Sequence, residues 1–288
     1  MDQAIDFHAL PQVAAGRARG GRDAQQDALV CLHDPASDTL LLVLADGMGG
    51  DGAGELAAEG VIDTARRLWE QGLWREQPGA LFLEALCQEA HSELVRRREG
   101  LVAGEPHSTV VALLVRGRQA YWAHVGDSRL YRFQGRRCLS RTEDHSVAQF
   151  KLRRGEITPE QLAGDPDQHK LLRGLGGSSA PEVEHGGAIL HAGQTFALCS
   201  DGVWEQLSLQ ELRRLSHRRD QAGALREALL LATARGGDQG DNAALIFVRV
   251  AGAGWMRRCG EKLWSAMHPA IAVAREAGEQ RLAGDGKA

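Results

Sequence analysis

Five aspartates stand at the ends of apolar runs or in glycine turns: Asp27, Asp46, Asp127, Asp201 and Asp241. Four of them sit in Gly-Asp or Asp-Gly steps, where the missing Cβ lets the backbone approach a ligand closely. A carboxylate at the end of a buried strand is costly unless it is paired or bound to a metal. Each step alone is explained as a hairpin turn, but the recurrence indicates one shared acidic site.

Carboxylate oxygens of this kind suit hard divalent cations such as Mg²⁺ and Mn²⁺. Two such ions about 3.5–4 Å apart can activate a water and neutralise the oxygens of a phosphoryl group. Phosphate monoesters hydrolyse very slowly without such help, so the aspartates predict metal-assisted phosphoryl chemistry. The turn that follows Asp46 lacks both the Lys-Ser/Thr of a nucleotide-binding loop and the ligand spacing of a calcium loop, which excludes those two sites.

The segments around the aspartates predict the elements that position them. Leu29–Leu32 and Thr39–Ala45 are apolar runs joined by a turn, which is typical of a hairpin. Ala53–Trp69 and Ala80–Arg97 carry apolar residues at helical spacing. Further strands are expected at Ser108–Val115, Gln119–Val125, Arg129–Phe133, Arg136–Leu139, Thr195–Cys199 and Ala243–Val250, and further helices at Leu209–Leu215 and Ala222–Thr233. Because short turns between strands require antiparallel pairing, the pattern predicts an α+β fold of layered sheets and helices.

Composition narrows the class of protein. The 288 residues are 43% apolar and 25% charged, which is typical of a folded protein, and the net charge of −4 gives no reason to expect nucleic acid or an anionic membrane as partner. Five widely spaced cysteines without a CxxC pair argue against a disulfide framework and a structural zinc site. No signal peptide or transmembrane run is recognisable, so the cytoplasm is the expected location.

The segment after Gly252 differs from the rest of the chain. Trp255, Cys259, Leu263 and Met267 fall on one helical stripe, which predicts an amphipathic C-terminal helix within residues 252–288. Such a helix could pack on its own domain or serve as a docking element for a partner. The sequence leaves both interpretations open.

Six short motifs stand in order along the chain and resemble those of the protein phosphatase 2C (PPM) family. They are Arg22-(x3)-Gln26-Asp27, Asp46-Gly47-x-Gly49-Gly50, Gly126-Asp127-Ser128-Arg129, Asp144-His145-Ser146, Ser200-Asp201-Gly202-Val203-Trp204 and Gly240-Asp241-Asn242. The resemblance implies a four-layer α-β-β-α sandwich of two antiparallel sheets flanked by helices. It also implies a catalytic domain at residues 1–251, with a flap at about 146–180, before the C-terminal extension.

The resemblance further implies a set of metal ligands. Asp46 would bridge two ions, Mn²⁺ or Mg²⁺, and the carbonyl of Gly47 would bind one of them. Asp201 and Asp241 would complete the ligands of the second ion. Asp127, together with Asp201, would hold a third ion.

Three more residues receive roles from the resemblance, and two depart from it. Arg22 would bind the substrate phosphate, whereas Asp27 and Asn242 would orient ligands or waters. Gln26 stands where many members have Glu, and unlike Glu it supplies no charge to the nearby metal. Met48 stands where some members have a His proposed as the general acid, and Met cannot donate a proton.

The implied activity is hydrolysis of phosphoserine and phosphothreonine in proteins by a water that two metal ions activate. The enzyme would be a metal-dependent protein serine/threonine phosphatase of bacterial type, acting on phosphorylated proteins and opposing a cognate serine/threonine kinase. Two alternatives stay open at this point. One is a non-catalytic binding module that keeps the fold, and the other is a hydrolase of small-molecule phosphates.

Overall fold

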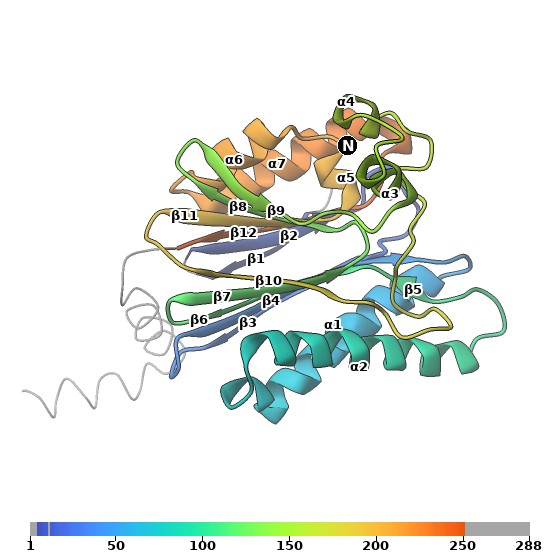
Figure 1. Ribbon diagram of the computed structural model, residues 1–288, viewed down its shortest axis with the longest axis horizontal. Helices are drawn as coiled ribbons and strands as arrows, with labels where there is room; N and C mark the ends of the chain where they lie inside the picture. The colour runs from blue at the N-terminus through green and yellow to red at the C-terminus, as the bar shows by residue number, and fades with distance from the viewer. Residues whose placement is uncertain (1–4, 11, 251–288) are drawn as a thin grey trace, which may run out of the picture.

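The structure, a computed structural model, describes residues 5–10 and 12–250 of the chain. Two antiparallel sheets pack face to face, with helices on both outer faces (Figure 1). One sheet has the strand order β1 (Ile5–Leu10), β2 (Val13–Ala18), β12 (Ala243–Arg249), β11 (Gln194–Cys199), β8 (Arg129–Gln134) and β9 (Arg137–Arg141). The other has the order β10 (Glu184–Ile189), β7 (Gln119–Val125), β6 (Val110–Arg116), β4 (Thr39–Met48) and β3 (Asp27–Asp34), and the short β5 (His107–Ser108) also pairs with β4.

Helices form the outer layers. The β3-containing sheet is covered by α1 (Ala53–Gln71) and α2 (Gly79–Glu99), with a 3-10 turn at Leu73–Arg75 between them. The β2-containing sheet is covered by α6 (Leu209–Ser216) and α7 (Gln221–Gly236), and a second 3-10 turn follows at Gly237–Gln239. Three short helices lie at one end of the sandwich, on the right in Figure 1: α3 (Val147–Arg153), α4 (Pro159–Leu162) and α5 (Asp201–Trp204).

Three apolar clusters hold the four layers together. Two lie between a sheet and its helices, and the third lies between the two sheets. Strand β4 contributes to two of them, because Leu41 and Val43 face the helices while Leu42 and Leu44 face the opposite sheet. Burial on both faces explains why Thr39–Ala45 reads as a continuous apolar run. The predicted α+β four-layer sandwich is confirmed.

Most of the predicted elements match observed ones, with two differences that concern the site. The hairpin extends further than predicted at one end, because β3 begins at Asp27 and β4 continues to Met48. The strand predicted at Ser108–Val115 is interrupted at Thr109, which separates β5 from β6. The sequence does not predict β1, β2 or β10.

Several predictions concern parts of the chain beyond this core. None of the helices formed by residues 5–10 and 12–250 is both long enough and apolar enough to cross a membrane. The amphipathic helix predicted after Gly252 lies outside the described residues. Four cysteines are described, and all four have free thiols: Cys31, Cys87, Cys138 and Cys199.

Candidate active site

Strand ends carry the predicted aspartates to one end of the sandwich. Asp27 opens β3 and lies directly opposite Asp46 of β4 in the antiparallel register. Asp201 follows β11, and Asp241 precedes β12, the strand paired with β11. Asp127 lies in the connection from β7 to β8, which crosses from one sheet to the other. Residues far apart in sequence therefore meet because the strands that carry them end together.

A pocket of about 230 Å³ opens among these strand ends. Its walls include seven of the eight predicted site residues: Arg22, Asp46, Gly47, Asp127, Asp201, Asp241 and Asn242. The eighth, Asp27, does not line the pocket and is 1% exposed. The remaining lining residues are Gln26, Met48, Gly49, His169 and Leu171.

The carboxylates of this pocket repel one another. Burial, and then the charges of Asp241 and Glu205, raise the pKa of Asp201 to about 7. Burial also raises the pKa of Asp46 well above its usual value, with a further contribution from Asp201. For Asp127, burial and then the charge of Asp201 raise the pKa in the same way. Bound cations would relieve this repulsion, so this donor set fits divalent metals.

Glycine is required where β4 meets the start of α1. A Cβ on Gly47 would lie 1.9 Å from the carbonyl oxygen of Gly54, and one on Gly54 would lie 2.3 Å from the side-chain nitrogen of Gln26. The amide of Gly47 also donates to the carbonyl of Gln26 at 2.9 Å. The Asp-Gly step therefore allows the first turn of α1 to pack directly behind Asp46.

Arg22 lies at the rim of the pocket. Its guanidinium donates to Oδ2 of Asp241 at 2.6 Å, and its side chain is 54% exposed. The hydrogen bond and charge of Asp241 raise the pKa of Arg22, so the guanidinium is charged throughout the physiological range. A planar guanidinium held in this way can bind two oxygens of a phosphoryl group.

Asn242 positions the loop that carries Arg22. Its Oδ1 accepts from the backbone N–H of Gln26 at 2.6 Å, and its Nδ2 donates to the carbonyls of Arg19 (2.7 Å) and Ala24 (3.0 Å). Asn242 is 3% exposed, so these bonds are shielded from water. The side chain thus fixes both ends of the loop around Arg22.

Asp27 acts from the layer beneath the pocket. Its Oδ2 accepts from the hydroxyl of Ser200 at 2.7 Å, and that hydroxyl accepts in turn from the backbone N–H of Ala244 at 2.9 Å. Burial raises the pKa of Asp27 well above its usual value. These bonds join the ends of β3, β11 and β12, so Asp27 ties the two sheets together beside Asp46.

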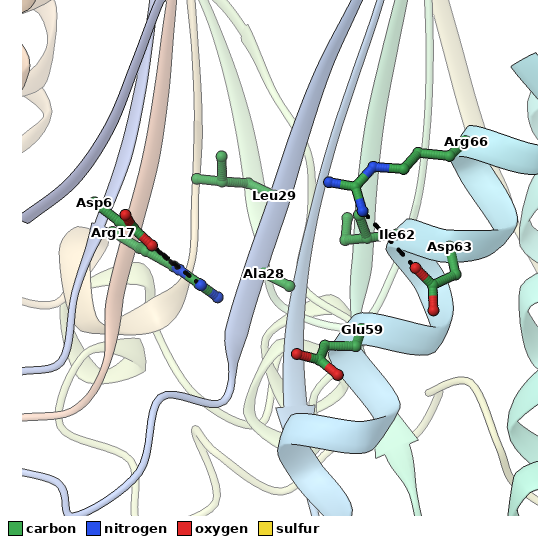
Figure 2. A pocket seen from close by; sticks show the side chains of 8 residues that line it. All are labelled: Asp6, Arg17, Ala28, Leu29, Glu59, Ile62, Asp63 and Arg66. Carbon is green, nitrogen blue, oxygen red and sulfur yellow. Dashed lines mark hydrogen bonds and ion pairs between the residues drawn. The ribbon is translucent and has the colours of Figure 1, made fainter.

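Figure 2 shows a second cavity, of about 300 Å³, at the edge of the sandwich beside β1, β3 and α1. Its two arginines each lie beside a carboxylate, since Arg17 pairs with Asp6 at 3.2 Å and Arg66 with Asp63 at 3.8 Å. This cavity therefore lacks the uncompensated acidic cluster of the pocket at the strand ends. Arg17 also donates to the carbonyl of Asp27 at 2.8 Å, which braces the start of β3.

A buried ion pair supports Asp127 from behind. Arg129 donates two hydrogen bonds to the carboxylate of Asp144, at 2.8 and 2.5 Å. Its guanidinium also stacks 3.4 Å above the ring of Trp204, whose indole N–H donates to the carbonyl of Asp127 at 3.0 Å. Three of the six sequence motifs meet in this contact, which explains residues that do not themselves reach the pocket.

Two residues at or beside the pocket are not predicted from the sequence. The ligand atoms of His169, Asp201 and Glu205 lie within 4.8 Å of one another. Glu205 follows Asp201 by one helical turn, so its spacing could have indicated a shared face. His169 lies in the segment after α4 and has no motif around it, so only the folded chain reveals its position.

The profile of the protein phosphatase 2C family matches residues 17–230, which is most of the chain. The matched range contains every residue that lines the pocket except the last two, Asp241 and Asn242. The chain belongs to the protein phosphatase 2C family. Five of its six motifs contribute residues to the pocket, and the sixth, Asp144-His145-Ser146, reaches Asp127 through its ion pair with Arg129.

Several bacterial proteins are similar to this protein phosphatase 2C. It is 32% identical over 178 residues to the serine/threonine phosphatase stp of Listeria monocytogenes, an alignment that covers 61% of the chain and 71% of that protein. The serine/threonine phosphatase PstP/Ppp of Mycobacterium tuberculosis matches with a TM-score of 0.73 and 26% identity, over 86% of the chain and 100% of that structure. The PstP catalytic domain in complex with 2 manganese ions matches with a TM-score of 0.69 and 26% identity, over 86% of the chain and 100% of that structure. The predicted enzyme class, a metal-dependent protein serine/threonine phosphatase, is confirmed.

Proposed function

We propose that this phosphatase hydrolyses phosphoserine and phosphothreonine esters in proteins and thereby opposes a serine/threonine kinase. One observation carries the proposal: four aspartates from separate strand ends converge on a pocket that Arg22 borders. The retained carboxylates argue against a non-catalytic module, even though Gln26 and Met48 depart from the family pattern. Both of these residues line the pocket without closing it.

The proposed metal ligands are Asp46, the carbonyl of Gly47, Asp201 and Asp241 for two ions, with Asp127 joining Asp201 for a third. Mn²⁺ and Mg²⁺ are the proposed ions, because the donor set consists of oxygens and is densely acidic. When bound, such ions lower the pKa of water and neutralise charge on phosphoryl oxygens. The chain itself contributes pre-organisation, since Asp27 and Asn242 hold the pocket walls in place before substrate binds.

Replacing Arg22 by Ala is expected to raise KM for p-nitrophenyl phosphate by about tenfold or more, since one bidentate phosphate contact is lost. Arg22→Lys should recover little of that loss, because a lysine keeps the charge but not the planar fork. Steady-state kinetics with Mn²⁺ measures both values. Arg66→Ala, on the exposed side of α1, is the matched control and should leave KM unchanged. Equal KM values in the Arg22→Ala and Arg66→Ala proteins would contradict the assignment.

A substrate panel tests the proposed function against the small-molecule alternative. With Mn²⁺, a phosphothreonine peptide is expected to be hydrolysed with a kcat/KM at least about tenfold higher than nucleotides or sugar phosphates. Phosphate release and its loss on addition of chelator are the measurements. Higher kcat/KM for a nucleotide would overturn the protein-phosphatase assignment in favour of a small-molecule hydrolase.

We also propose that residues 1–251 act as the catalytic domain and that residues at about 146–180 act as its flap. The domain boundary is supported by β12, which belongs to the first sheet and ends at Arg249. The flap is supported by α3 and α4, which lie at one end of the sandwich, and by His169 and Leu171, which line the pocket. The free thiols suit the cytoplasm, the proposed location. The extension at 252–288 is proposed as a docking element for a partner.

A further inference from the structure

A groove of about 590 Å³ adjoins the metal pocket. The two cavities share Met48 and Leu171 in their walls, so they lie side by side. The groove is lined further by His107, Leu172, Arg173 and the loop of residues 177–182. A phosphorylated residue bound at the aspartates would therefore lie within reach of this groove through its neighbours in the chain.

Backbone hydrogen bonds hold the groove rigidly against the metal pocket. The strand end that carries Asp46 pairs Met48 with His107 of β5. The next residue, Ser108, exchanges two hydrogen bonds with Leu175, at 3.2 and 2.8 Å. Leu175 ends the segment 172–175, and at its start Leu172 donates its N–H to the carbonyl of His145 at 2.7 Å. Because the floor is fixed before anything binds, little ordering free energy opposes the binding of a peptide there.

The side chains of the groove favour an uncharged occupant. Leu172 is 56% exposed and contributes apolar surface beside Met48 and Leu171. The basic groups of the wall already have acidic partners, since Arg173 pairs with Glu182. The same holds for His107, whose Nε2 lies 3.3 Å from a carboxylate oxygen of Glu105. Burial of an aliphatic side chain against the leucines is favourable, whereas an acidic side chain would have to compete with these existing pairs.

We infer that this groove binds the residues flanking the phosphorylated residue of a protein substrate and selects an aliphatic side chain there. The inference rests on the proposed protein-phosphatase function and adds the substrate class to it. An extended peptide advances about 3.3 Å per residue, so three residues on either side of the phosphorylated one reach roughly 10 Å, which is the range of positions to be tested. Leu172 is the specificity-determining residue, since its exposed side chain has no role in the apolar core.

Phosphopeptides that place Leu, Ala or Asp at each position from −3 to +3 test this inference. In the wild-type protein with Mn²⁺, Leu at one or two positions should raise kcat/KM about fivefold or more over Ala, through a lower KM with similar kcat. Asp at the same positions should not exceed Ala. The ratio of the Leu to the Ala peptide is an internal measure within each enzyme and does not depend on its overall activity.

The Leu172→Ser protein should lose this preference, so that the ratio falls to about one. Leu81→Ser is the matched control, because Leu81 is a similarly exposed leucine (60%) on α2, outside the groove, and should keep the wild-type ratio. Equal rates for all flanking residues in the wild type, a preference for Asp, or an unchanged ratio in the Leu172→Ser protein would overturn the groove assignment while leaving the phosphatase activity established. Failure to hydrolyse any phosphopeptide would instead overturn the proposed function.

Discussion

The Asp46→Asn protein is expected to hydrolyse p-nitrophenyl phosphate and phosphopeptides with a kcat/KM about 1,000-fold or more below that of the wild type. Asp46 stands at the end of β4 in the pocket wall, where its carboxylate is surrounded by those of Asp201, Asp27 and Asp127. An amide cannot supply the charge that two divalent cations require. Initial rates over a range of Mn²⁺ concentrations are the measurement, because they separate weaker metal binding from loss of turnover.

Stability distinguishes loss of the site from loss of the fold in this variant. Burial and neighbouring carboxylates raise the pKa of Asp46, so an uncharged amide should raise the Tm of the metal-free protein by a few degrees. Asp220→Asn is the matched control, because Asp220 caps α7 through the N–H of Gly223 (2.8 Å) and Asn caps equally well. Activity of Asp46→Asn within tenfold of the wild type would contradict the assigned role.

The metal-free protein is expected to become less stable as pH rises. The pKa of Asp201 is raised from 3.8 to about 7, mainly by burial and then by Asp241 and Glu205, so the folded state holds a proton that the unfolded state has lost. This contribution is fully present below pH 4 and is lost as pH rises through 7, by up to roughly 4 kcal/mol in the free energy of unfolding. Asp46, whose pKa is also raised, acts in the same direction.

Denaturant unfolding with chelator and with excess Mn²⁺, at pH 5 to 8.5, measures this effect. Cations compete with protons for the same oxygens, so the stabilisation by Mn²⁺ should grow with pH. The Asp201→Asn protein supplies the control and should show a flatter profile without metal. A metal-free stability that stays constant or increases over this window would show that the carboxylates are not mutually repelling in the folded protein.

Much of the fold follows from local patterns, and two of the three strands that were not predicted, β2 and β10, share a physical reason. β2 consists largely of small residues, because α7 packs closely on it: a Cβ on Gly16 would lie 3.0 Å from the side chain of Leu225. In β10, a Cβ on Gly186 would lie 2.2 Å from the ring of Trp122 in the neighbouring strand. Each segment has a single β-branched residue, Val13 in β2 and Ile189 in β10, and both stand at a strand end. In between, the neighbouring element supplies the bulk, so the pattern that marks a strand is missing.

The site, like the fold, has features that the local sequence predicts and features that only the folded structure shows. The chemistry of its residues and their place at strand ends are local properties, so Asp46, Asp127, Asp201 and Asp241 could be recognised from the apolar runs and glycines beside them. The amide of Asn242 acts through the loop between β2 and β3, and the carboxylate of Asp27 acts through Ser200 after β11. These partners are distant in sequence, so the positioning roles required the folded structure.

Local sequence was enough to identify the carboxylates, since an acidic group next to a buried strand needs a partner wherever the strand lies. Their convergence, the approach of His169 and the groove beside Leu172 depend on which strands pair and on how the chain returns between α4 and β10. Those arrangements arise from contacts between residues far apart in sequence, and no short segment contains them. The physical limit is that a pattern reports what surrounds a residue along the chain, whereas the pocket consists of what surrounds it in space.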